Sequence, residues 1–69
     1  SNDGLIIANM HYKIEKLSVA NAAQKLAKSD NETLMFRNAA HMGLNLLLKN
    51  SNGTIEWIDP RGFREAIKL

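Results

Sequence analysis

The chain has no cysteine and few proline or aromatic residues, with one Pro, one Trp, one Tyr and two Phe among 69 residues. Without cysteine it can form neither a disulfide framework nor a thiolate zinc site, which excludes disulfide-stapled secreted domains and zinc fingers. No apolar run approaches the roughly 20 residues of a membrane-spanning helix. A chain this short buries too little surface to enclose a deep catalytic cleft. We therefore expect one small domain that is not an enzyme and uses no cofactor, metal or membrane.

The charge balance is mildly basic, and we expect no targeting signal in the first residues. Nine Lys and Arg against seven Asp and Glu give a net charge of +2, which permits nucleic-acid binding without requiring it. The first residues lack a charged segment followed by an apolar one, so we expect a cytoplasmic protein. Ser1 and Asn2 fit the remnant of a cleaved tag. We expect residues 1–9 to form an arm and residues 10–69 to form a single domain.

The first part of the chain predicts a strand followed by a helix. Polar and apolar residues alternate over Met10–Glu15, a pattern that is typical of a half-buried strand. Ser18 then precedes a helical pattern that runs to about Lys28, and its hydroxyl suits an N-cap. The expected buried stripe is rich in alanine, which predicts a closely packed partner helix. Its residues are Val19, Ala22, Ala23, Leu26 and Ala27.

A second helix is predicted over residues 32–42. Asp30 or Asn31 can cap its start, and Gly43 is a natural C-terminal stop. Its expected apolar stripe faces the first helix, whereas Thr33, Arg37 and His41 recur every four residues on the opposite side. The apolar stripe comprises Met35, Phe36, Ala39 and Ala40.

The last third predicts a hairpin and a short final helix. The strand-like runs 44–49 and 54–58 flank Asn52-Gly53, a strong hairpin signal because both residues tolerate positive φ. Asp59 and Pro60 suit the N-cap and first turn of a helix that carries Phe63, Ala66 and Ile67 on one face. We expect Trp57 to fill the thin core with Tyr12 beside it.

The order strand, helix, helix, hairpin, helix is that of a small α+β winged helix-turn-helix. Residues 17–29, with a Ser cap followed by Val19, Ala22, Ala23 and Leu26, resemble the opening of excisionase and MerR-like DNA-binding domains. Residues 52–67 look like the wing and closing helix of the same family. The resemblance spans about residues 17–68 and implies a winged helix-turn-helix that binds double-stranded DNA.

Within this fold, the helix around 32–42 would read the major groove, and the wing at 49–53 would lie along the backbone or the minor groove. Arg37 suits a guanine edge and Asn38 suits adenine. Lysines on the first helix suit flanking phosphates. The expected DNA-binding residues are Thr33, Arg37, Asn38, His41, Lys49, Asn50, Asn52, Lys25 and Lys28.

We therefore expect a sequence-specific DNA-binding protein, either a small transcriptional regulator or an excisionase-like factor. Three alternatives stay open: a winged-helix module that binds protein, a polar stripe that is only a solvated helix face, and a ribbon-helix-helix dimer whose ribbon is Met10–Glu15. A homodimer or a partner protein also stays open. His11 and His41 lie far apart without an accompanying carboxylate pattern, so no metal site is expected.

Overall fold

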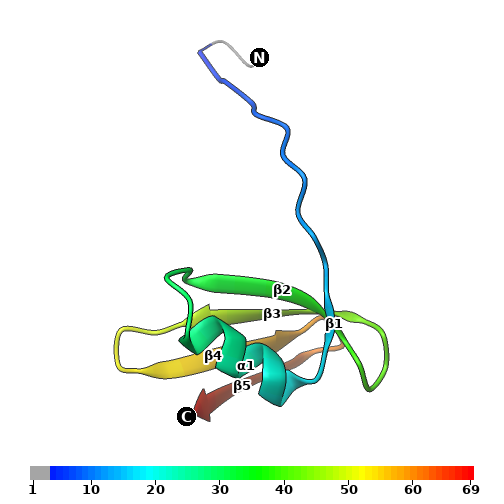
Figure 1. Cartoon of the computed structure of the whole chain (residues 1–69), viewed down its shortest axis with the longest axis vertical. Helices are drawn as coiled ribbons and strands as arrows, with labels where there is room; N and C mark the ends of the chain where they lie inside the picture. Colours follow the sequence, from blue (N-terminus) through cyan, green and yellow to red (C-terminus); the bar gives the residue numbers. More distant parts are fainter. Residues whose placement is uncertain (1–3) are drawn as a thin grey trace.

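A computed structural model describes residues 4–69 as one helix packed on a five-stranded sheet (Figure 1). The sheet order is β1-β2-β3-β4-β5; β1 runs parallel to β2 and all other neighbours are antiparallel. The tag remnant expected at Ser1 and Asn2 lies outside the described residues. The elements are β1 (Lys16–Leu17), α1 (Val19–Ala27), β2 (Thr33–Asn38), β3 (Leu44–Lys49), β4 (Thr54–Asp59) and β5 (Phe63–Lys68).

The predicted first helix is confirmed as α1, together with its cap. The Ser18 hydroxyl accepts a hydrogen bond from the Asn21 N–H at 3.1 Å, which satisfies one of the free donors of the first turn. The expected partner helix is absent from the described chain, because the small residues of α1 pack on the sheet instead. Ala27, expected on the buried stripe, is exposed. The core joins Ala22, Ala23 and Leu26 of α1 to Phe36, Leu47 and Ile55 of the sheet.

The predicted second helix is wrong, because its first half is strand β2 and its second half is a turn. Leu34 pairs with Leu47 and Phe36 with Asn45, so β2 is held by β3 along its length. A short segment with three consecutive apolar residues, here Leu34–Phe36, fits the helical and the strand period alike, and pairing decides between them. Met42 follows β2 with a φ of 64°, a left-handed conformation that no helix contains.

The predicted hairpin is confirmed as β3 and β4, and Gly53 at its turn has a φ of 85°. The predicted last helix is wrong, since Phe63–Lys68 is the edge strand β5. Gly62, with a φ of 109°, donates its N–H to the Asp59 carbonyl at 2.9 Å and closes a tight turn over Pro60. With a single helix in residues 4–69, the fold is not a winged helix-turn-helix, and the expectation of one is wrong.

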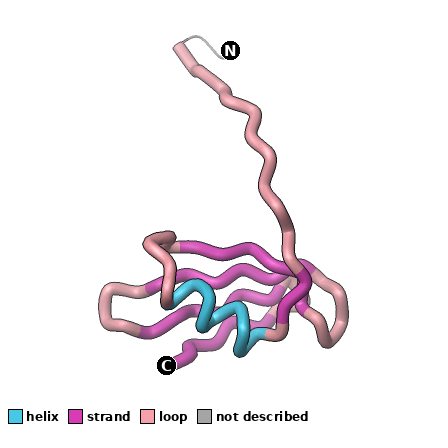
Figure 2. Tube along the Cα trace, in the orientation of Figure 1, coloured by secondary structure: helices cyan, strands magenta, loops and turns pink. Residues whose placement is uncertain are grey.

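The predicted strand over Met10–Glu15 is also wrong, because residues 4–15 form an extended arm that leaves the sheet (Figure 2). Met10 is 86% exposed. Tyr12 does not lie beside Trp57: the indole packs against the core, whereas the Tyr12 hydroxyl contacts the backbone of Met35. Strand pairing begins only at Lys16, where β1 meets β2.

Candidate interaction surface

The two faces of the sheet differ in what covers them. Successive residues of a strand point to opposite faces, so the register assigns each side chain to one of them. Phe36, Leu47 and Ile55 point toward α1, on the side that we call the covered face. Their chain neighbours point to the opposite side, which we call the open face; no helix or strand of the described chain lies over it (Figure 1).

Apolar side chains occur on the open face of four strands, with polar and charged side chains between them. Met35 pairs with Leu46, and Leu46 with Ile58, so these three side chains form one row. Leu48 lies in the next row, and Met35 and Leu44 are 40% and 39% exposed. Contiguous apolar surface of this kind usually marks an interaction site. The apolar residues of the open face are Met35, Leu44, Leu46, Leu48, Ile58 and Ala66.

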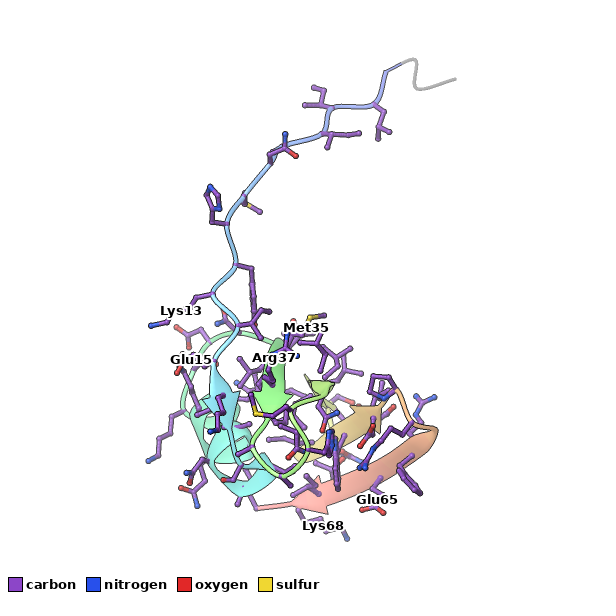
Figure 3. The ribbon with its side chains drawn as sticks, turned by 90° about the vertical axis from the view of Figure 1, so that its right-hand side faces the viewer. Lys13, Glu15, Met35, Arg37, Glu65 and Lys68 are labelled. Atoms are coloured by element: carbon purple, nitrogen blue, oxygen red, sulfur yellow. The ribbon has the colours of Figure 1, made fainter. Side chains whose placement is uncertain are left out.

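Charged groups lie within the open face as well, since Glu56 lies between Leu48 and Ala66 and Arg64 is paired with Ile58; one groove also lies on this face. Arg37 of β2 donates a hydrogen bond from Nη1 to the Met42 carbonyl at 2.7 Å. Arg64 of β5 forms an ion pair with Glu56 of β4. Beside the arm lies a shallow groove of about 310 Å³, lined by Tyr12, Ile14, Thr33, Met35 and Leu46. Figure 3 shows Met35 and Arg37 close to the place where the arm joins the sheet.

Of the residues expected to bind DNA, only Thr33 and Arg37 lie on the open face. Asn38 is 4% exposed; its Nδ2 donates to Asn45 Oδ1 at 2.8 Å and its Oδ1 accepts from the Ala40 N–H at 2.9 Å. A side chain held in this way is not free to pair with a base. His41 lies in the β2–β3 turn.

The remaining expected residues lie elsewhere. Lys49 ends β3 and donates to the Ser29 carbonyl at 2.5 Å. Asn50 and Asn52 hold the β3–β4 turn through the Thr54 hydroxyl, at 3.0 and 2.7 Å. Lys25 and Lys28 belong to α1 and its C-cap, and Lys25 forms an ion pair with Glu15. The structure therefore brings Lys49, Asn50 and Asn52 together at one turn but does not join all nine residues in one surface.

Two buried polar clusters on the covered face were not predicted from the sequence. In the first, Asn45 Oδ1 accepts from both Asn38 Nδ2 and the Trp57 indole N–H, the latter at 3.0 Å. The sequence feature that indicates this cluster is the single amide side chain of Asn45, which lies between Leu44 and Leu46 in an otherwise apolar stretch of β3. Because both donors are wholly or partly buried, this single oxygen satisfies groups that would otherwise be costly to desolvate.

The second cluster surrounds the fully buried carboxylate of Asp59. The Arg61 guanidinium donates to it from Nη2 at 2.8 Å, and the Arg61 backbone N–H donates at 2.9 Å. The Arg61 side chain, followed by this backbone N–H, holds the pKa of Asp59 at about 2, below its usual 3.8. His41 Nε2 is 3.4 Å away, while its Nδ1 accepts from the Gly43 N–H at 2.9 Å. The cluster ties two turns at one end of the sheet.

The described residues give no sign of a chemical centre. No group of three or more His, Cys, Asp or Glu side chains in residues 4–69 is placed to hold a metal ion. Within the same residues, no helix has the length and hydropathy to cross a membrane. A second shallow groove, of about 300 Å³, lies between the end of α1 and the β3–β4 hairpin, with Ala27, Lys49, Asn50 and Ile55 among its lining residues. It is open and holds no cluster of ionisable groups.

No protein-family model and no solved structure matches the chain significantly. A search of curated proteins finds similarity to a ribosome hibernation promotion factor of Rhizobium meliloti (strain 1021), 37% identical over 54 residues. The alignment covers 78% of this chain but only 28% of that protein. The expected resemblance to excisionase and MerR-like domains is therefore wrong, and so are the roles in DNA binding and transcriptional regulation that it implied. This relative is named for the ribosome, and residues 4–69 contain one helix and no helix-turn-helix.

Proposed function

We propose that this chain is a binding segment of a ribosome-associated factor and that it acts in the cytoplasm, where ribosomes work. The observation that supports this most is the 37% identity over 54 residues to a protein named a ribosome hibernation promotion factor. Because the chain corresponds to 28% of that protein, the proposal concerns one segment of such a factor rather than its whole activity.

The proposed action is binding, with no catalytic step. An enzyme needs a nucleophile, an acid–base pair or a metal in a pocket that excludes water. The two grooves described above are shallow and open, and the Asp59 carboxylate is already occupied by Arg61. The apolar open face, in contrast, is suited to macromolecular contact, since apolar side chains at the centre of an interface supply most of its free energy.

The open face also favours a second role that is compatible with the first, in which two copies of the chain pack sheet to sheet. A sheet with apolar side chains on both faces is stable when each face is covered by another layer. A second copy offers the same row of Met35, Leu46 and Ile58, and two such faces can interdigitate about 10 Å apart, as the sheets of a sandwich do. A twofold axis would make the contact self-complementary.

Cosedimentation with purified bacterial ribosomes on sucrose gradients tests the first proposal. The wild-type chain is expected in the ribosomal fractions at two salt concentrations, because a contact that depends on apolar burial is less sensitive to salt than nonspecific binding by a basic protein. A chain that stays at the top of the gradient would overturn ribosome binding.

A matched pair of charge variants tests the role of the open face. Leu44→Glu introduces a carboxylate on the open face, and Gln24→Glu introduces one on the exposed side of α1. We expect Leu44→Glu to weaken ribosome binding roughly tenfold and Gln24→Glu to leave it unchanged, because only the first places a charge where it must be desolvated. Equal binding by both variants would show that the ribosome contacts another surface. Sedimentation equilibrium without ribosomes tests self-association, and a monomer at every concentration would exclude it.

A further inference from the structure

The junction between the arm and the sheet is an unfinished parallel ladder. Lys16 is paired with Arg37 and Leu17 with Asn38. The Arg37 N–H donates to the Glu15 carbonyl at 2.8 Å, and the Ala39 N–H donates to the Leu17 carbonyl at 2.9 Å. Hydrogen bonds in a parallel ladder repeat every two residues.

The next step of this repeat defines two specific hydrogen bonds. The Met35 N–H would donate to the Lys13 carbonyl, and the Met35 carbonyl would accept from the Glu15 N–H. Both groups of Met35 are held instead by one side chain. The Met35 N–H donates to the Tyr12 hydroxyl at 3.0 Å, and that hydroxyl donates to the Met35 carbonyl at 3.2 Å. Tyr12 therefore satisfies the free edge of β2 in place of a strand.

If the register of β1 and β2 continues into the arm, each side chain of the arm is assigned to one face of the sheet. Ile14 would lie beside Met35 and Tyr12 beside Thr33, both on the open face. The groove of about 310 Å³ lined by these four residues and Leu46 is already present there. Glu15, labelled in Figure 3, would stay on the side of α1. It already forms an ion pair there with Lys25. The alternation of Tyr12, Lys13, Ile14 and Glu15 thus fits a strand at this edge.

We propose that residues 12–15, the strap, close onto the free edge of β2 as an N-terminal extension of β1. On closure, the Met35 N–H and carbonyl lose their hydrogen bonds to the Tyr12 hydroxyl and form hydrogen bonds to the Lys13 carbonyl and the Glu15 N–H. Closure also moves the side chains of Tyr12 and Ile14 into the groove. The open face then extends across a further strand, so a partner bound there holds the strap closed. Closure requires neither a ribosome nor a second copy, and it can be tested on the chain alone.

Amide hydrogen exchange measured by NMR separates closure from simple release of the arm. Tyr12→Phe removes the hydroxyl that occupies Met35 and keeps the ring that would fill the groove. We expect the Met35 amide to stay protected and the Glu15 amide to exchange roughly three- to tenfold more slowly, because each donates to a backbone carbonyl in the closed state. The Leu47 amide in the central strand serves as the internal control for global unfolding. Faster exchange at Met35 with no change at Glu15 would overturn the proposal.

A proline variant identifies the hydrogen bond itself. In the Tyr12→Phe background, Glu15→Pro removes the N–H that closure needs, whereas Glu15→Ala retains it, and both remove the ion pair with Lys25. The Glu15 carbonyl that accepts from Arg37 is present in both variants. We expect the Met35 amide to lose protection in the proline variant only. Equal protection in the two variants would mean that the Glu15 N–H takes no part and that the strap does not close in this register.

Discussion

The two faces of the sheet carry similar amounts of apolar side chain but have different surroundings. On the covered face, Phe36 and Leu47 are fully buried beneath α1. On the open face, Met35 and Leu46, their neighbours in sequence, are exposed and half-buried. The covered face also contains the buried polar residues of the described chain, namely Asn38, Asn45 and Asp59. The covered face therefore supplies the stability and the specific geometry of the fold, whereas the open face contributes little to either.

The composition of the open face indicates that it has another purpose. Leu46, Leu47 and Leu48 form an uninterrupted apolar run, whereas a strand with one face in water usually alternates apolar and polar residues. Runs of this kind are typical of strands covered on both sides. A sheet built this way is expected to acquire a second layer from outside residues 4–69, as the proposed ribosomal contact and the proposed self-association both require.

The largest contrast is expected from adjacent residues of β2. Phe36→Ala removes a fully buried ring from the covered face and should lower the free energy of unfolding by about 3–5 kcal/mol. Met35→Ala, one residue earlier on the open face, should cost less than about 1 kcal/mol. Urea denaturation followed by tryptophan fluorescence measures both. If Met35→Ala costs as much as Phe36→Ala, the open face is covered in solution, and the loss should then depend on protein concentration.

A smaller loss is expected from the polar interior of the covered face. Asn45→Ala removes the oxygen that accepts from Asn38 and Trp57. A buried donor left without an acceptor costs about 1–3 kcal/mol, and the Trp57 N–H is only partly buried and costs less, so we expect a total of about 2–4 kcal/mol in the same denaturation assay. Thr54→Ala is a control because it removes hydrogen bonds from an exposed turn. Equal losses in the two variants would mean that water replaces the Asn45 oxygen.

Close packing beneath α1 gives the next effect. Ala23 is fully buried against the sheet, and Ala20, on the same helix, is exposed. Ala23→Leu should destabilise the fold by about 1–3 kcal/mol, because the interior has no room for three more carbons. Ala20→Leu should be neutral within about 0.5 kcal/mol. Thermal melting compares the two variants. A neutral Ala23→Leu would mean that α1 can move away from the sheet without loss.

Local signals in the sequence predict the parts of this fold that depend on neighbouring residues. The Ser18 cap and the spacing of Ala22, Ala23 and Leu26 predicted α1, and Asn52-Gly53 predicted the β3–β4 hairpin. The segments mistaken for helices are strands whose state is decided by pairing with the adjacent strand and not by the period of their own residues. Phe63–Lys68 becomes β5 because it pairs with β4, although Asp59-Pro60 also suits a helix start.

The candidate surface was harder to predict than the fold. Assigning residues 32–42 to a helix placed Thr33, Arg37 and His41 on one solvent-facing stripe, whereas a strand places Met35 beside Arg37 on the open face. The apolar character of that face appears only when β2, β3 and β4 are aligned in register, which a single sequence does not specify. The Asp59 cluster likewise joins two separate turns, because His41 lies in the β2–β3 turn whereas Asp59 and Arg61 flank the β4–β5 turn, so no local pattern indicated the whole cluster.

The smallest effect in this series concerns acid stability. The pKa of Asp59 is about 2 in the folded chain and 3.8 ordinarily, so its carboxylate stabilises the fold above pH 3.8. That contribution is lost as the pH falls from 3.8 toward 2, because protonation removes the acceptor that Arg61 needs. Wild-type protein should therefore require less urea to unfold at pH 2.5 than at pH 5. Asp59→Asn should be less stable than wild type at pH 5, and the two should converge near pH 2.

Glu15 provides the matched comparison, because the hydrogen bond and charge of Lys25 also lower the pKa of Glu15. Its ion pair is solvent-exposed, whereas the Asp59 side chain is fully buried on the covered face. Exposed ion pairs contribute little, so Glu15→Gln should change the acid dependence less than Asp59→Asn does. An equal change in the two variants would mean that burial on the covered face adds nothing to the Asp59–Arg61 pair.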